Sequence, residues 1–263
     1  MIRNAILLIL LGAAVVMQAQ KSPQEKQLFD QLNQSRKDAG LPPLAWDERL
    51  AAAAREHTQR MASANQLGHV LKGEAPVAER IAASGVHFNR SGENVGYDSQ
   101  FDDLERIWME SPPHRENILN PDYNMVGIAA ARTDDGIWYA TQDFAHGIPQ
   151  RTAAEAENLV AQSFEDLRKK EGHPPLDRVS DAHVHDLACS MAHSGTLDPK
   201  AALKLAGVGA AVVYNNPFPE ELPDSAKSTA RNKRFTKFAV GACFAEDAPG
   251  NPGGTFYVVM TFY

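Results

Sequence analysis

The sequence predicts an α+β fold built as two successive units, and three observations indicate it. Segments with helical periodicity alternate with short segments of strand character, so neither an all-helical nor an all-β chain fits the pattern. Stretches of the first half recur more weakly in the second half, which indicates a duplicated domain rather than a solenoid of many short repeats. The length of 263 residues is enough for two modest domains.

The composition is that of a folded protein with few cysteines. Hydrophobic residues make up 43% of the chain, which excludes wholesale disorder. The net charge is −7, whereas general nucleic-acid binders carry an excess of positive charge. We therefore expect no nucleic-acid partner. Two cysteines cannot build a disulfide scaffold or a four-cysteine zinc site.

Residues 1–19 have the pattern of a signal peptide. Arg3 supplies a positive start, and residues 5–17 form an almost uninterrupted apolar run that is too short to span a bilayer. The polar residues that follow place cleavage after Ala19, and an uncleaved N-terminal anchor is the alternative. We therefore expect a secreted or periplasmic protein, without stable membrane insertion after cleavage, in a compartment that permits disulfides.

Two helices are predicted at the start of the first unit. Residues 22–25 (Ser-Pro-Gln-Glu) form a capping box with proline at the first helical position, and Gly40 ends this helix. Asp47 can cap the second helix, whose apolar face carries Leu50, Ala54, His57 and Met61. We interpret His57 as a packed core histidine, because this face must be buried.

The remainder of the first unit is expected to alternate helix and strand. A short helix is predicted at 77–84, and residues 91–97 indicate a turn followed by a short strand. A further helix must stop near Ser111, because Pro112 disfavours helical geometry in the residue before it. The unit closes with a β-hairpin whose strands span 125–131 and 137–144.

Residues 155–263 repeat the pattern of residues 23–147. Residues 36–44 have the sequence RKDAGLPPL, and residues 168–176, which lie 132 positions further along, have the sequence RKKEGHPPL. The spacing of the shared segments places the linker near 148–154. We therefore predict two related units joined by a short connection.

Four polar residues of the first unit stand out as candidates for a site: His69, Glu93, Glu110 and His114. Imidazole and carboxylate groups are ligand types suited to zinc and similar divalent ions. Glu110 lies at the carboxyl end of a predicted helix, where the helix dipole disfavours negative charge, so a cation is expected beside it. Arg115, a protonated His114 or a bound metal are the alternatives for that cation.

Five short motifs contain or surround these residues. They are Leu-Gly-His at 67–69, Gly-Glu-Asn-Val-Gly at 92–96, Trp-Met-Glu-Ser-Pro-Pro-His-Arg at 108–115, Asn-Ile-Leu-Asn-Pro at 117–121 and Tyr-Asn-Met-Val-Gly-Ile at 123–128. In this order they closely resemble the bacterial, SCP-like extracellular branch of the CAP superfamily. That superfamily includes the cysteine-rich secretory proteins, the insect antigen 5 proteins and the plant pathogenesis-related 1 proteins. The resemblance covers about residues 25–146.

The resemblance implies an α-β-α sandwich with a cleft that holds two histidines and two glutamates. It implies that His69 and His114 bind a divalent metal, with zinc the expected ion, and that Glu93 and Glu110 lie close by. The second unit lacks the Gly-Glu-Asn and Ser-Pro-Pro-His-Arg motifs, and Pro199 stands where His69 would correspond. We therefore expect a degenerate CAP-like repeat without the four-residue site.

Two functions remain open for such a protein. A secreted binding protein would hold the metal and a small ligand, such as a lipid, glycan or peptide, or a component of the cell envelope. A metal-dependent extracellular hydrolase of the peptidase type would use Glu93 or Glu110 as the general base on bound water. The family implies no uniform catalytic activity, so binding is favoured and enzymatic activity is left open.

The two cysteines are predicted to form a disulfide in the second unit. Cys189 and Cys243 are the only cysteines of the chain, and the expected compartment is oxidising. Two buried free thiols are the alternative. Histidines two residues apart do not share a helix face, so we interpret the histidines of this unit as a solvated scatter rather than a metal site. These histidines are His173, His183, His185 and His193.

Overall fold

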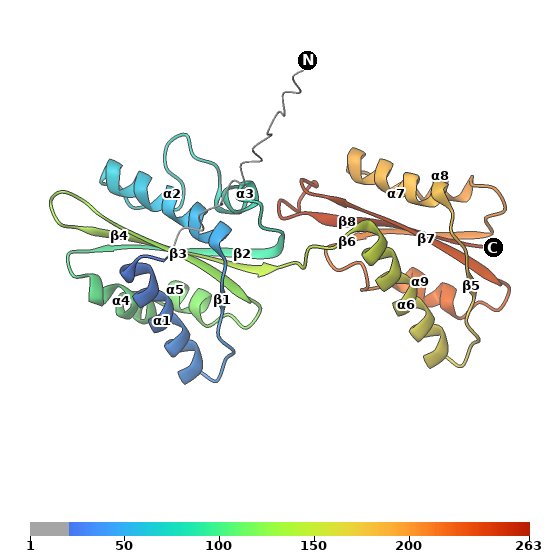
Figure 1. Ribbon diagram of the computed structural model, residues 1–263, viewed down its shortest axis with the longest axis horizontal. Helices are drawn as coiled ribbons and strands as arrows, with labels where there is room; N and C mark the ends of the chain where they lie inside the picture. Colours follow the sequence, from blue (N-terminus) through green and yellow to red (C-terminus); the bar gives the residue numbers. More distant parts are fainter. Residues whose placement is uncertain (1–20) are drawn as a thin grey trace, which may run out of the picture.

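The computed structural model describes residues 21–263, which form two α/β units in succession (Figure 1). In each unit a four-stranded mixed sheet lies between two layers of helices, so the predicted α-β-α sandwich is confirmed. The signal peptide predicted at 1–19 lies outside the described residues. Within residues 21–263, no helix combines the length and the apolar character needed to cross a membrane.

The first sheet has the strand order β1-β3-β4-β2, with β1 parallel to β3 and the other pairs antiparallel. Its strands are β1 (Ala45–Trp46), β2 (Phe88–Asp98), β3 (Met125–Arg132) and β4 (Trp138–Gly147). One face is covered by α2 (Glu48–Ala64) and α3 (Val77–Ala83). The other face is covered by α1 (Pro23–Asp38), α4 (Leu104–Glu110) and α5 (Pro112–Ile118), with a 3₁₀ turn at Phe101–Asp103 before α4.

The second sheet has the corresponding order β5-β7-β8-β6, again with one parallel pair. Its strands are β5 (Asp177–Arg178), β6 (Ala210–Asn216), β7 (Lys237–Ala245) and β8 (Thr255–Phe262). Figure 1 shows the helices on its two faces. They are α6 (Ala153–Lys170) and α9 (Asp224–Ala230) on one face, and α7 (Ala182–Ser194) and α8 (Pro199–Leu203) on the other.

The predicted helix starts in the first unit are confirmed. The Ser22 hydroxyl accepts from the Glu25 N–H, and the Glu25 carboxylate accepts from the Ser22 N–H, which completes the capping box. The Asp47 side chain caps α2 by accepting backbone N–H groups of its first turn. The predicted inner face of α2 is fully buried at Leu50, Ala54, His57 and Met61.

The turn predicted within residues 91–97 is wrong, because β2 continues through it as one strand from Phe88 to Asp98. Gly92 lies where other residues approach the strand closely, and the chain does not turn there. A Cβ atom at this position would lie 2.4 Å from the Tyr123 hydroxyl and 3.0 Å from Asn117 Oδ1. Glycine therefore lets the loop after α5 pack directly on the strand.

A second difference lies just after the predicted helix stop at Ser111. The helix α4 does end at Glu110, but a new helix, α5, begins at once with Pro112. Proline has no N–H and a fixed φ, which suits the first position of a helix. His114 therefore lies in the first turn of α5, a helix that the sequence analysis had not predicted.

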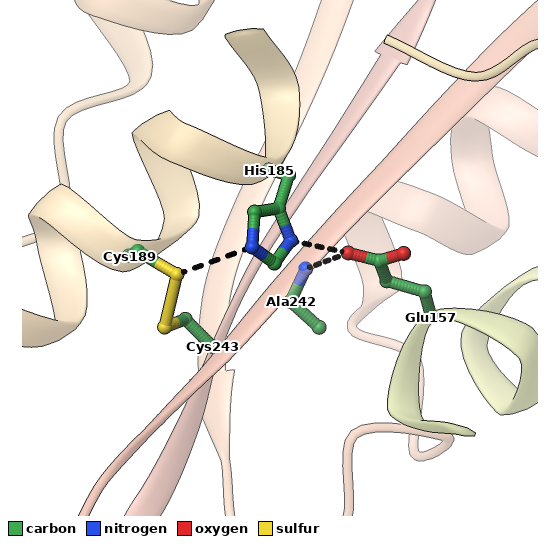
Figure 2. The surroundings of a disulfide bond; sticks show 5 residues. All are labelled: Glu157, His185, Cys189, Ala242 and Cys243. Atoms are coloured by element: carbon green, nitrogen blue, oxygen red, sulfur yellow. Dashed lines mark hydrogen bonds and ion pairs between the residues drawn. A yellow bond between two sulfur atoms is a disulfide. The ribbon is translucent and has the colours of Figure 1, made fainter. Parts of the chain in front are cut away.

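The predicted disulfide between Cys189 and Cys243 is confirmed (Figure 2). It joins α7 to β7, with the two Cα atoms 4.9 Å apart. Both cysteines are half-buried on the side of the sheet that α7 covers.

Candidate functional site

A buried carboxylate, Glu93, is the centre of the candidate site. It lies on β2, an edge strand of the first sheet, and its side chain is only 1% exposed. Its Oε1 atom lies 2.8 Å from Nδ1 of His69, and its Oε2 atom accepts from the guanidinium of Arg80. His57 Nε2 is 3.7 Å from the same Oε2 atom. Three side chains from three segments therefore converge on one acid.

Arg80 of α3 is the cation that neutralises this cluster. Besides Glu93, it donates to the carbonyl oxygens of His69 at 2.8 Å and Ala75 at 3.2 Å. Its Nε atom lies 3.7 Å from Oε1 of the buried Glu74. No motif or spacing in the sequence linked Arg80 to Glu93. Only the fold brings α3 onto the edge of the sheet.

His57 is buried as predicted, but it is hydrogen-bonded rather than packed only among apolar groups. Its Nδ1 atom lies 2.8 Å from Glu74 Oε1, and its Nε2 atom lies 2.9 Å from the Gly68 carbonyl oxygen. Both neighbours are hydrogen-bond acceptors, so the ring is held between two oxygens. Burial opposes ionisation of Glu74, but the hydrogen bonds from the Leu71 N–H and from His57 hold its pKa below the ordinary value.

Asp143 is a second buried acid directly beside Glu93. It lies opposite Glu93 in the pairing of β2 with β4 and is fully buried. Neither of its side-chain oxygens has a hydrogen-bond partner among the described residues. Burial, and then the negative charge of Glu93, raise the pKa of Asp143 well above its ordinary value. The environment of Asp143 therefore favours the neutral acid more than water does, because a carboxylate there would place a second negative charge beside Glu93.

His69 lies exposed in the loop between α2 and α3, with 55% of its side chain open to solvent. Its Nδ1 atom is engaged by Glu93, so in the neutral ring the lone pair lies on Nε2. The hydrogen bond to Glu93 raises the pKa of His69 above its ordinary value, although partial burial acts in the opposite direction. The buried acid therefore fixes both the orientation and the tautomer of an exposed imidazole.

His114 approaches the same region from α5. Its Nδ1 atom is buried and has no hydrogen-bond partner among the described residues. Burial, and then the positive charge of His69, lower the pKa of His114 below its ordinary value. Two asparagines hold α5 at the edge of β2: Asn94 donates to the His114 carbonyl oxygen at 3.0 Å, and Asn117 donates to the Glu93 carbonyl oxygen at 3.2 Å.

Glu110 does not join this group. Its side chain is 64% exposed and pairs with Arg106, one helical turn earlier, at 2.9 Å. The structure places the guanidinium of Arg106 beside Glu110, a cation that the sequence analysis had not considered. Of the four predicted residues, the structure pairs His69 with Glu93, ties the backbone of His114 to β2 through Asn94, and pairs Glu110 with Arg106.

The candidate metal ligands of this site are the imidazole nitrogens of His69 and His114. Within residues 21–263, no group of three or more His, Cys, Asp or Glu side chains is arranged to hold one. His69 and His114 remain as donors, one oriented by a buried carboxylate and the other with an orphaned ring nitrogen. Two imidazoles of this kind fit a zinc ion that completes its coordination with water or ligand atoms. Glu93, already engaged by Arg80 and His69, orients one histidine and is not itself a free ligand.

A chain of buried polar groups continues from this site through the sheet. Asn94 donates to Gln142 at 3.0 Å, Gln142 donates to Glu105 at 3.1 Å, and the Ser35 hydroxyl of α1 donates to Glu105 at 3.1 Å. Burial raises the pKa of Glu105 to about 7. The spacing of Glu105 and Trp108 on one helix face would have indicated a buried acid here.

A comparison with known proteins identifies the first unit. Residues 29–144 match the model of the cysteine-rich secretory protein family, CAP. The uncharacterized membrane protein YlbC of Bacillus subtilis (strain 168) is 32% identical over 126 residues, which cover 47% of this chain and 35% of that protein. The uncharacterized protein YkwD of the same organism is 31% identical over 124 residues, which cover 47% of each chain.

One solved structure is an extracellular protein containing a SCP domain from Bacillus anthracis. It is 27% identical with a TM-score of 0.42, and the match covers 48% of this chain and 44% of that one. The chain thus spans less than half the length of the two Bacillus subtilis relatives. The family match falls on the unit that holds His69, Glu93 and His114. Residues 29–144 match the CAP family model, so the similarity to this family is confined to the first unit.

Proposed function

We propose that the first unit is an extracellular binding module in which His69 and His114 hold one divalent metal ion, with zinc the expected ion. The observation that supports this most is the exposed imidazole of His69, held by the buried Glu93 next to a second imidazole with an unpartnered nitrogen. A bound zinc ion would supply positive charge to an oxygen of a lipid, glycan or peptide ligand. A component of the cell envelope is the natural source of such a ligand for an exported protein.

The geometry favours binding over hydrolysis. A general base on bound water needs a carboxylate that is free to accept a proton. Glu93 is held by Arg80 and His69 and is almost fully buried, and Glu110 is paired with Arg106 away from the histidines. Neither candidate base is therefore placed for the hydrolase alternative.

Removing both histidines is expected to abolish zinc binding in this unit. Calorimetric titration with zinc should give one site per chain for the wild type and none for the variant H69A/H114A. The variant E93Q should bind about 10–100-fold more weakly, because the ring of His69 loses the carboxylate that orients it. The matched control is H183A/H193A, which removes two exposed histidines of the second unit. Equal affinity in H69A/H114A and the wild type would refute the site.

The zinc affinity measured in this titration should depend on pH, and the pKa shifts of the two histidines predict how. Zinc needs neutral imidazoles, so protons compete with it. The pKa of His69 is raised by Glu93, so affinity should begin to fall at a pH above the ordinary histidine value of 6.5 as the solution is acidified. The pKa of His114 is lowered by burial, so this ring should stay available to lower pH. In E93Q the fall should shift to lower pH; an unchanged profile would argue against zinc at His69.

We further propose that residues 155–263 are a degenerate copy of the unit at 23–147. One buried arginine in each unit supports this. Arg36 donates to the carbonyl oxygens of Pro42, Ile118 and Asn120. Arg168, which lies 132 positions further along, donates to those of Pro174, Ala230 and Asn232. The same guanidinium thus ties the first helix of each unit to the loop that follows it and to a later helix end.

Export through the segment at 1–19 is the remaining part of the proposal. Sequencing the N-terminus of protein recovered outside the cytoplasm should give a chain that begins at Gln20. Cytoplasmic protein that retains Met1 would contradict export.

A further inference from the structure

A histidine and a glutamate form a pair against one sulfur of the disulfide in the second unit (Figure 2). His185 Nδ1 lies 2.7 Å from Glu157 Oε1, and His185 Nε2 lies 3.6 Å from the Cys189 sulfur. His185 is therefore hydrogen-bonded as well as partly exposed, which the sequence analysis had not predicted. It lies one helical turn before Cys189 on α7, while Glu157 approaches from α6 across the edge of the sheet.

The edge of β7 holds Glu157 in place. β5 pairs with β7 only at Lys237 and Phe238, so further along the strand this edge of β7 is not covered by β5. There the N–H of Ala242, next to Cys243, donates to Glu157 Oε1 at 3.2 Å. The same oxygen thus binds the backbone beside one cysteine and the imidazole beside the other.

Two other charged side chains near the ring have neutral hydrogen-bond partners of their own. A cavity of about 470 Å³ is lined by His185 and Glu157, and also by Arg178 and Asp181. Arg178 donates to Asn158 at 2.7 Å, and Asp181 accepts from the His183 N–H at 3.0 Å and from the Tyr263 hydroxyl at 3.0 Å. Glu157 is therefore the carboxylate that engages the imidazole.

The bond is open to reagents in solution. Cys189 and Cys243 are both only half-buried, and 42% of the His185 side chain is exposed. The cavity beside the ring admits water, so the imidazole can exchange its proton. A disulfide that served only to cross-link the fold would need neither the exposure nor the aligned imidazole.

We propose that the Cys189–Cys243 disulfide is a thiol–disulfide exchange site that oxidises dithiols. The thiolate of an incoming dithiol attacks the Cys243 sulfur and forms a mixed disulfide, and the Cys189 sulfur leaves as a thiolate against the protonated His185. The second thiolate of the dithiol then attacks the mixed disulfide and releases Cys243. Two electrons pass from the dithiol, which becomes a disulfide, to the cysteine pair, which becomes two thiols.

The proposal depends on a difference between the two states of Cys189. A sulfur in a disulfide is a weak hydrogen-bond acceptor, whereas a thiolate is a strong one that carries charge. The imidazolium of His185 therefore stabilises the reduced form more than the oxidised form, and such stabilisation makes a disulfide a better oxidant. Glu157 acts as a positioning residue, because it holds the ring with Nε2 directed at the sulfur.

The first test measures the equilibrium with dithiothreitol at pH 7 in the full chain. Acid quenching, alkylation and mass spectrometry count the two cysteines without ambiguity, because the chain has no others. The variant H185Q should be about tenfold harder to reduce than the wild type, which corresponds to about 30 mV for a two-electron couple. The matched control H193Q, which changes an exposed histidine of the same helix, should behave as the wild type does.

The second test labels the reduced protein with iodoacetamide at pH 6 and compares the two thiols. Cys189 should react at least about tenfold faster than Cys243 in the wild type and in H193Q, because only a thiolate is alkylated. In H185Q and in E157Q this preference should fall toward unity, with the far-UV circular dichroism unchanged. Equal labelling of both thiols in the wild type, or reduction equilibria that do not differ between wild type and H185Q, would overturn the proposal.

Discussion

Replacing Arg80 with methionine is expected to lower the free energy of unfolding of the first unit by about 3–5 kcal/mol, the usual cost of removing one partner from a buried ion pair. Arg80 is 10% exposed and its partner Glu93 is 1% exposed, so water cannot replace the lost contacts. Glu74 and the carbonyl oxygen of His69 lose the same guanidinium. The substitution should therefore destabilise the whole buried cluster, because it removes several contacts at once.

Urea unfolding followed by tryptophan fluorescence reports on this unit alone. The three tryptophans of the chain are Trp46, Trp108 and Trp138, and all lie before the linker. The control is R106M, because Arg106 is an exposed arginine whose surface pairs contribute little to stability. The double variant R80M/E93Q should be more stable than R80M, since it removes the uncompensated charge. An R80M transition that coincides with that of R106M would contradict the role given to Arg80.

Replacing both cysteines with alanine is expected to lower the free energy of unfolding of the second unit by about 4 kcal/mol. The disulfide closes a loop between positions 54 residues apart, and its removal gives the unfolded chain more conformational freedom. The same bond joins α7 to β7 and so connects one helical layer to the sheet.

Two probes separate this effect from any change in the first unit. Far-UV circular dichroism follows the helices of both units, whereas tryptophan fluorescence follows only the first. In C189A/C243A, the dichroism transition of the second unit should move to a lower urea concentration. The fluorescence transition, which reports on the first unit, should not move. Unchanged dichroism, or an equal shift in both signals, would contradict a local cross-link.

The sequence predicted local features of the fold more reliably than close approaches. Ser22 and Asp47 carry their capping signals within three residues, so the starts of α1 and α2 could be predicted. A glycine such as Gly92 can serve either a turn or a close contact, and the sequence does not distinguish these two roles. Only the position of Tyr123 in the fold shows that Gly92 serves a close contact. Pro112 was correctly interpreted as a stop but also starts α5, because proline suits both roles.

The residues of the candidate site also differ in whether the sequence alone could reveal them. His69, Glu93 and His114 were found through short motifs, and the fold joins His69 to Glu93 by a hydrogen bond. Arg80 and Asp143 were missed, because each meets Glu93 only through tertiary packing: one from α3, the other across the pairing of β2 with β4. Glu110 was included on its motif, but its position one turn after Arg106 gives it a surface partner instead.

The central claim is that the imidazoles of His69 and His114 bind one metal ion while Glu93 keeps the Nδ1 proton of His69. The most direct measurement is a long-range ¹H–¹⁵N correlation spectrum of the histidine rings during a zinc titration. One equivalent of zinc should shift the ring nitrogens of His69 and His114 together, with His69 bound through Nε2 and still protonated at Nδ1. Ring nitrogens of both residues that stay unchanged at saturating zinc would contradict the claim.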